Sequence, residues 1–218
     1  MVKRFGYFLL SLLALCQSVS CMGEAAPVFP VGLGPVMDNT ANYPEATERY
    51  EYPEEVNIVT GTASLPWVHG RGYVHGSIER VWEAMREPEV LVDRRNVDEW
   101  AVEYDIDDTY SHSFRIHNIA HEAIDVEFDL EWRQDVIDGS PAAPDIVASR
   151  SSLSESTLFL TTVEVSTTLI AIDDSTTAIE IVQVVDAIST DELVLRTAVG
   201  DWFDDMTAWI AGEEMVAF

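Results

Sequence analysis

A run of alternating apolar and charged residues near the middle of the chain most constrains its fold. The apolar members alternate with acidic residues and Arg133, and they are Ile124, Val126, Phe128, Leu130 and Trp132. Because successive side chains of a strand point to opposite faces, this alternation predicts an antiparallel strand with one buried and one solvated face. The chain is therefore expected to form a sheet whose apolar face is buried against another part of the protein.

Other segments carry strand signals of the same kind. Further strands are predicted at 65–75, 113–119 and 146–153, with a hairpin of 158–172 and 178–188. Gly70 and Gly72 in the first of these indicate bulging or the close approach of another backbone. Turn-forming residues separate the later strands, namely Gly139, Pro141 and Pro144, and then Asp173, Asp174 and Ser175. Together these strands predict a meander.

Two segments have helical spacing. Ser77 can cap a first helix that carries Ile78, Val81, Trp82 and Met85, and Pro88 either ends it or starts another short helix. A polar loop at 93–98 follows. The second helix opens with a capping box, Ser189 and Glu192, and ends at Gly212. Its apolar stripe is Leu195, Val199, Trp202, Met206 and Trp209 or Ile210.

The first 21 residues have the composition of a secretory signal. Lys3 and Arg4 precede an apolar run from Phe5 to Leu15, and small residues stand before Cys21. The run is shorter than the roughly 20 residues that a permanent transmembrane helix needs. We therefore expect an exported protein, on the periplasmic or outer-envelope side of the membrane.

Cys21 resembles the lipid-modified cysteine of bacterial lipoproteins, which follows a small residue such as Ser20. Ser18 departs from the leucine usual at its position in that pattern. The prediction is a lipid on Cys21 that anchors the protein to a membrane, and the alternative is ordinary cleavage near Ser20 or Ala25. The only other cysteine is Cys16, so no disulfide is expected in the mature protein.

The charge balance excludes several functions. The chain has 12 basic and 39 acidic residues, a formal net charge of −27. Such a charge repels phosphates, so nucleic acid is excluded as a partner. Lys3 is the only lysine and lies in the signal, which excludes Schiff-base chemistry. Scattered acids of this kind are typical of a solubility or salt adaptation of the surface.

The remaining chain divides into two parts. Glycine and proline punctuate residues 22–56 and leave no apolar period, which predicts a flexible tether or an arm laid on the domain. Three tyrosines could dock part of it: Tyr43, Tyr50 and Tyr52. Residues 57–218 have the size of a single domain.

The order of these elements resembles the START-like, or SRPBCC, superfamily of polyketide cyclases, lipid-transfer domains and carriers of the birch-pollen-allergen type. The resemblance covers about 65–212. In the family an Ala-Pro pair often precedes a Val-Trp pair by four residues; here Gly76 and Ser77 replace the first pair, while Val81 and Trp82 match the second. The resemblance implies an α+β helix-grip fold, in which a curved antiparallel sheet wraps around a long C-terminal helix and short helices follow the first strand.

The resemblance also implies a cavity between the sheet and that helix. The residues expected to line it are Phe128, Leu130, Trp132, Trp202, Met206 and Trp209. The alternative is that these large side chains fill a solid core.

Catalytic and metal motifs are weak. His117 and His121 are four apart, but their surroundings indicate a strand and no third ligand has matching spacing, so neither a metal nor another cofactor is expected. No serine elbow and no phosphate loop is present. Nothing in the sequence demands catalysis.

Three hypotheses remain. The first is a cell-envelope binding protein that holds or transfers a hydrophobic or amphipathic small molecule or lipid. The second is an enzyme of the polyketide cyclase or dehydratase type, with His75 or Tyr73 as acid or base in the cavity. The third is a structural envelope protein that binds no ligand.

Overall fold

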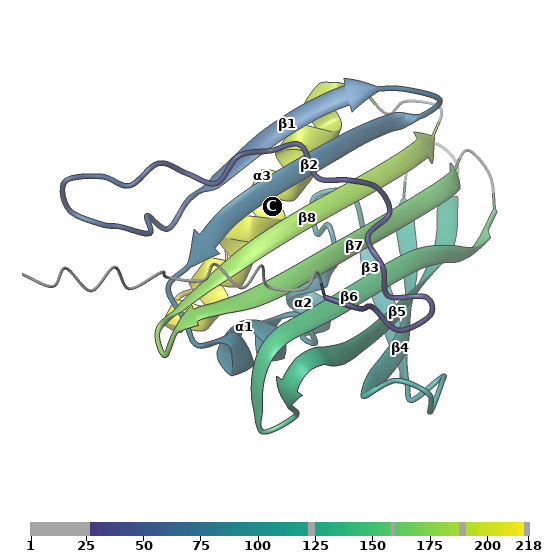
Figure 1. The fold of residues 1–218 in the computed structure, drawn as a ribbon. Coiled ribbons are helices and arrows are strands. Elements are labelled where there is room, and N and C mark those ends of the chain that lie inside the picture. Colours follow the sequence, from purple (N-terminus) through teal and green to yellow (C-terminus); the bar gives the residue numbers. More distant parts are fainter. Residues whose placement is uncertain (1–26, 122–124, 158–159, 188–190, 216–218) are drawn as a thin grey trace, which may run out of the picture.

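The computed structural model describes residues 27–121, 125–157, 160–187 and 191–215, and most of them belong to one antiparallel sheet (Figure 1). Its eight strands are arranged in the order β1-β2-β8-β7-β6-β5-β4-β3. Their bounds are β1 Val56–Thr62, β2 Pro66–Val74, β3 Glu99–Tyr104, β4 His112–His121, β5 Asp125–Ser140, β6 Ala143–Ser156, β7 Leu160–Asp173 and β8 Thr176–Ala187. The predicted meander is confirmed from β4 to β8, and the predicted first strand, β2, pairs with β8.

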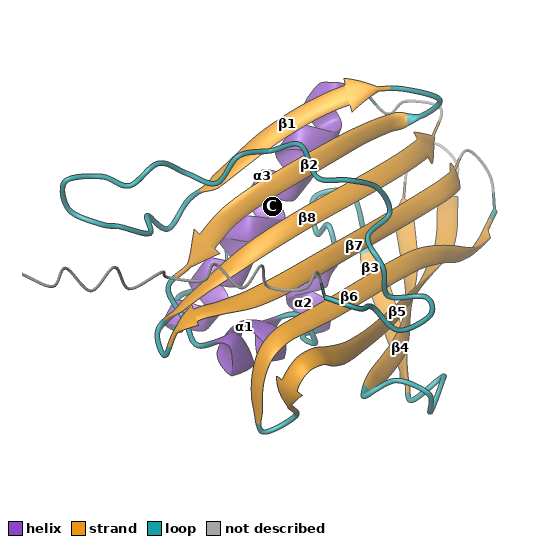
Figure 2. Cartoon of the chain, in the orientation of Figure 1, coloured by secondary structure: helices purple, strands orange, loops and turns teal. Residues whose placement is uncertain are grey.

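A long C-terminal helix, α3 (Glu192–Ala211), crosses one face of this sheet (Figure 2). Asp191 caps its start by accepting hydrogen bonds from two backbone N–H groups, while Ser189 of the predicted capping box lies outside the described residues. Gly212 ends the helix with a φ of 73°, as predicted, because this left-handed conformation favours glycine. Helix and sheet together form the α+β helix-grip fold.

Two short helices follow β2. In α1 (Ile78–Ala84), the hydroxyl of Ser77 accepts the N–H of Arg80, as the predicted cap requires. Pro88 starts α2 (Pro88–Leu91). Buried Gln134 of β5 holds this end of the molecule together: it accepts from Trp82 Nε1 at 2.8 Å and donates to the carbonyl of Met85 at 2.7 Å.

Residues 27–55 form an arm before β1, and part of it crosses the outer face of the sheet from β6 to β2 (Figure 1). Arg150 donates to the carbonyl of Gly34, and Asn39 donates to the carbonyls of Gly70 and Ile181. In the middle of the arm, Tyr43 stacks on Tyr73 at 5.1 Å between ring centroids. These contacts attach the arm to the outer face of the sheet.

Two strands without a sequence signal, β1 and β3, form the two edges of the sheet. Both strands are short, and although their burial alternates along the strand, none of their side chains is fully buried, so their pattern is weaker than that of β5. The close backbone approach predicted at Gly72 occurs against the unpredicted strand, since a Cβ there would lie 2.4 Å from the carbonyl oxygen of Glu55. Because β1 precedes β2, the short helices α1 and α2 follow the second strand of the chain and not the first.

Candidate functional site

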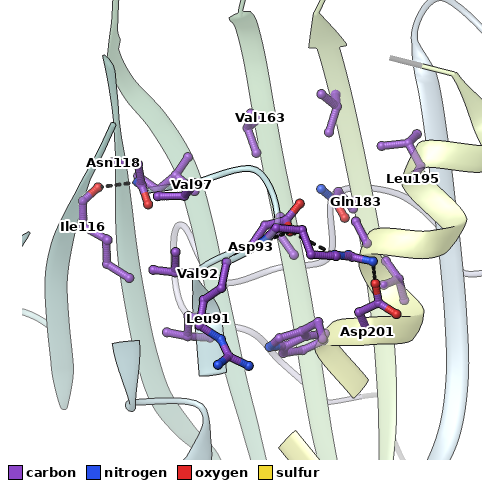
Figure 3. Close-up of a pocket in the computed structure, with 18 of the residues that line it drawn as sticks. Leu91, Val92, Asp93, Val97, Ile116, Asn118, Val163, Gln183, Leu195 and Asp201 are labelled. Atoms are coloured by element: carbon purple, nitrogen blue, oxygen red, sulfur yellow. Dashed lines mark hydrogen bonds and ion pairs between the residues drawn. The ribbon is translucent and has the colours of Figure 1, made fainter. Parts of the chain in front are cut away.

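A cavity of about 250 Å³ lies between the inner face of the sheet and α3. Helix α3 packs on β1 and β2, so the opposite half of the curved sheet is left at a distance from it. The loop between α2 and β3 spans part of this space (Figure 3). The walls are mainly apolar, and their large apolar side chains come from α2, β4, β5, β7, β8 and α3: Leu91, Ile116, Phe128, Leu130, Trp132, Leu160, Ile181, Leu195 and Trp202.

Four of the six residues predicted to line a cavity do so: Phe128, Leu130, Trp132 and Trp202. The other two lie on α3 but face elsewhere. Met206 is fully buried in the core between the sheet and the helices. Trp209 packs under the guanidinium of Arg80, with 3.7 Å between Arg80 Cζ and the ring centroid. The apolar stripe of α3 therefore lines the cavity at Trp202 and packs into the solid core at Met206.

Ion pairs join the loop after α2 to helix α3 beside the cavity. Arg94 binds Asp205 at 2.8 Å, and the two side chains are only 18% and 10% exposed. Arg95 binds Asp201 and, at 3.3 Å, Asp93 of its own loop. Because Asp201 and Asp205 are four residues apart, both carboxylates lie on one side of the helix. Each carboxylate on this wall is thus held by a guanidinium.

The polar lining further includes two amides and the indole N–H groups of Trp132 and Trp202, which have no hydrogen-bond partner in the described chain. Asn118 of β4 donates to the carbonyls of Ile116 and Phe128, so its NH₂ group is committed to the backbone of the sheet. Gln183 of β8 lies on the wall between strands and helix (Figure 3). Within the described part of the chain, its amide has no hydrogen-bond partner. No histidine, cysteine, serine or tyrosine is among the described lining residues.

Sequence reasoning assigns none of these polar residues to the site. The 93–98 loop is recognisably polar, but nothing in the local sequence indicates that Arg94 and Arg95 pair with aspartates of α3. A signal does exist for the helix, since Asp201 and Asp205 flank the apolar position of Trp202 within a buried stripe. Gln183 likewise interrupts a run of apolar residues in β8.

The residues considered for catalysis or metal binding lie outside the cavity. Tyr73 belongs to the outer face of β2, where Tyr43 and Tyr52 contact its ring, and His75 follows at the end of that strand with Nε2 2.8 Å from the Tyr52 carbonyl. The hypothesis that either residue acts inside the cavity is therefore wrong.

His117 and His121 lie on the outer face of β4, paired with acids of β5. His117 Nδ1 is 2.6 Å from Asp129, and His121 bridges Asp125 and Glu99. These acids raise the pKa of His121, chiefly through the hydrogen bond with Asp125 and then that with Glu99. Among the described residues, no group of three His, Cys, Asp or Glu side chains has the arrangement of a metal site.

Helix α3 is the longest described helix, and neither it nor any other helix in the described ranges is both long and apolar enough to cross a membrane. Anchoring through Cys21 stays a prediction, because that residue lies outside those ranges.

No protein-family model matches this chain, and no curated protein sequence does. Several solved structures, however, are similar to the fold of this chain. Human StAR-related lipid transfer protein 5 matches with a TM-score of 0.51 at 12% identity, over 84% of this chain and 88% of that one. A STAR-related lipid transfer protein from Xanthomonas axonopodis matches at 0.50 with 9% identity, over 83% and 99%. The human StarD13 lipid transfer and protein localization domain also matches at 0.50, with 10% identity over 72% and 83%.

These matches define the chain as a protein of the START-like helix-grip fold. At such low identity the likeness extends to the fold alone, and the chemistry of the cavity must be read from this chain's own residues.

Proposed function

We propose that this protein holds a small hydrophobic or amphipathic molecule in the cavity between its sheet and α3. The cavity itself carries the proposal: its volume is about 250 Å³, its walls are mainly apolar, and they come from several strands and one helix. A hollow of this kind lowers the stability of the fold, because the atoms that line it lack packing partners. A bound molecule would supply these contacts. Ligand sites typically have this apolar, concave character.

The polar side chains favour binding over catalysis. The carboxylates on the wall, Asp93, Asp201 and Asp205, are each held by an arginine. These carboxylates are therefore engaged in ion pairs within the protein. The described lining offers no nucleophile of the serine or cysteine type. Lipid transfer, the activity named for the human and Xanthomonas proteins of the same fold, agrees with a carrier role.

We further propose that the carrier works in the cell envelope, anchored by a lipid on Cys21. The support is the sequence of residues 1–21, a charged start followed by an apolar run and a small residue before the cysteine. An anchored carrier would collect or deliver its ligand at a membrane surface.

The test is to fill the cavity with a side chain. Ala198 lines the cavity on α3, whereas the neighbouring Thr197 is exposed and is not part of the lining. The full chain should bind N-phenyl-1-naphthylamine, an uncharged fluorescent probe. Ala198→Phe should weaken that binding at least about ten-fold because the ring occupies the ligand's space, while Thr197→Phe should leave it unchanged.

Equal binding by both variants would place the probe elsewhere and contradict the proposal. Failure of the unmodified protein to bind the probe, together with no retained small molecule in native mass spectrometry of protein purified from its own envelope, would leave the structural hypothesis. Thermal unfolding of each variant shows whether it remains folded.

A further inference from the structure

Gln183 is a polar interruption in the apolar wall of the cavity. Its neighbours on the inner face of β8 are Ile181 and Val185, and the residues opposite it on the adjacent strands are Val68 and Val165. An apolar residue at this position would continue the packing of the wall. Gln183 is only partly buried, so its amide, which has no hydrogen-bond partner within the described chain, is open to water or to a molecule in the cavity. Its presence is explained if a bound molecule supplies the partner.

The two amides on the cavity wall differ in availability. Asn118 uses both of its N–H donors on the sheet, with distances of 2.9 Å to the Ile116 carbonyl and 3.3 Å to the Phe128 carbonyl. Gln183 keeps its donors and its acceptor for a ligand. Because an amide both donates and accepts, it matches a head group that does the same, such as a hydroxyl or a carboxamide.

The charged lining disfavours an anionic head group. Three carboxylates, those of Asp93, Asp201 and Asp205, face two guanidiniums, those of Arg94 and Arg95. The wall therefore carries an excess of one negative charge. A carboxylate ligand would add a second charge in an apolar space, or would have to displace an aspartate from its arginine. An ammonium group meets the opposite field, but it must lose its hydration shell and finds the aspartates already paired.

The volume limits the body of the ligand. Its volume of about 250 Å³ lies just below the range of roughly 300–1,000 Å³ that is typical of pockets for drug-sized ligands. A single short chain or a small ring system fits this space, and a two-chain phospholipid does not.

We propose that the cavity selects a small uncharged amphiphile whose hydroxyl or carboxamide head is hydrogen-bonded by the side-chain amide of Gln183. The apolar body of the ligand then lies against Val163, Ile181 and Leu195. This inference rests on the proposed carrier function and adds to it the class of ligand and the residue that recognises it.

The test compares four ligands of equal chain length as competitors of N-phenyl-1-naphthylamine: 1-decanol, decanamide, decanoate and decylammonium. With the full chain near neutral pH, decanol and decanamide should bind about ten-fold more tightly than the two ions. Gln183→Leu, which keeps the approximate size of the side chain, should bind the probe normally and lose about ten-fold in affinity for decanol and decanamide. Gln183→Glu should shift the preference toward decylammonium.

The outcomes separate the inference from the function beneath it. If the probe does not bind at all, the carrier function fails and the ligand class with it. If the probe binds but decanoate or decylammonium competes as well as decanol, the cavity is a binding site and the uncharged-ligand inference is overturned. Unchanged affinity for decanol in Gln183→Leu would overturn the role of Gln183. The comparison of ligands on the unmodified protein needs no variant to fold.

Discussion

Arg94, in the loop after α2, forms an ion pair of 2.8 Å with Asp205 in the second half of α3. The partners are 111 residues apart in the chain, and both line the cavity. With the neighbouring contact of Arg95 and Asp201, this pair ties the loop to the helix along one side of the cavity. A ligand that enters on this side has to separate loop from helix, so the ion pairs are expected to affect both stability and ligand exchange.

Asp205→Asn should lower the free energy of unfolding by about 3 kcal/mol, because it leaves the largely buried Arg94 without its counter-charge. The matched control is Glu83→Gln, which breaks the exposed pair with Arg80 and should cost less than about 0.5 kcal/mol. Denaturant unfolding measures both. In a double-mutant cycle with Arg94→Gln, additive effects of the two changes would show that the pair is not coupled.

The arm depends on a neutral histidine. His69 of β2 is buried beneath the arm, and its Nδ1 accepts the backbone N–H of Thr40 at 3.0 Å. Burial, together with the nearby guanidinium of Arg71, lowers the pKa of His69 below its usual value of about 6.5. Protonation of Nδ1 would turn this acceptor into a donor and break the contact with the arm.

We therefore predict that the free energy of unfolding decreases as the pH falls below about 6.5, since the unfolded chain then binds a proton that folded His69 does not. His69→Gln should flatten that part of the pH profile. Hydrogen exchange at the Thr40 amide should become faster over the same range. A profile identical in protein and variant would show that His69 does not control the arm.

His121 supplies a control of opposite sign. Its pKa is raised by Asp125 and Glu99, so its contribution to stability is complete below about pH 6.5 and is lost as the pH rises through the folded value. His121→Gln should therefore remove stabilisation on the acidic side. If both histidine variants change the profile in the same direction, general charge effects are responsible.

The predicted lipid anchor depends on one cysteine, Cys21. Cys21→Ser should move the protein from the membrane fraction to the periplasm or medium, because the several acyl chains of a bacterial lipoprotein anchor it firmly. Cys16→Ser, a change five residues away at the end of the apolar run, should leave the protein at the membrane. Cell fractionation and the mass of the N-terminal peptide measure the two effects. Membrane retention of the Cys21→Ser protein would exclude the lipid as the anchor.

The parts of the fold that could be predicted are those with a local pattern. Alternation identifies β5, and spacing of three and four residues identifies α3, so Trp132 and Trp202 can be assigned to the cavity from their segments and the resemblance. Periodicity cannot separate Met206 and Trp209 from Trp202, because all three share one stripe and only the position of the helix on the sheet decides which faces the hollow.

The polar part of the site has no local pattern. Arg94 and Asp205 meet only after the chain has folded, and a polar loop before a strand is common in any sequence. Gln183 looks like a break in a buried strand when only its own segment is considered. Because β8 is buried on both faces, its own sequence does not show which face Gln183 occupies.

Trp202 offers the sharpest distinction between a hollow and a solid interior, because Trp82 provides a comparison within the same chain. Trp82 is packed in the core and donates its Nε1–H to Gln134, while Trp202 lines the cavity and its Nε1–H has no partner in the described structure. Trp82→Ala should cost about 4–5 kcal/mol in the free energy of unfolding through lost burial, the hole left behind and the unpaired glutamine. Trp202→Ala should cost about 3 kcal/mol or less, since part of its surroundings is already unfilled.

Ligand binding should change the fluorescence of the protein, and Trp202→Phe should remove that change while Trp209→Phe, away from the cavity, retains it. Equal destabilisation by the two alanine variants, with a ligand signal that survives Trp202→Phe, would mean that the space beside Trp202 is not where the ligand lies.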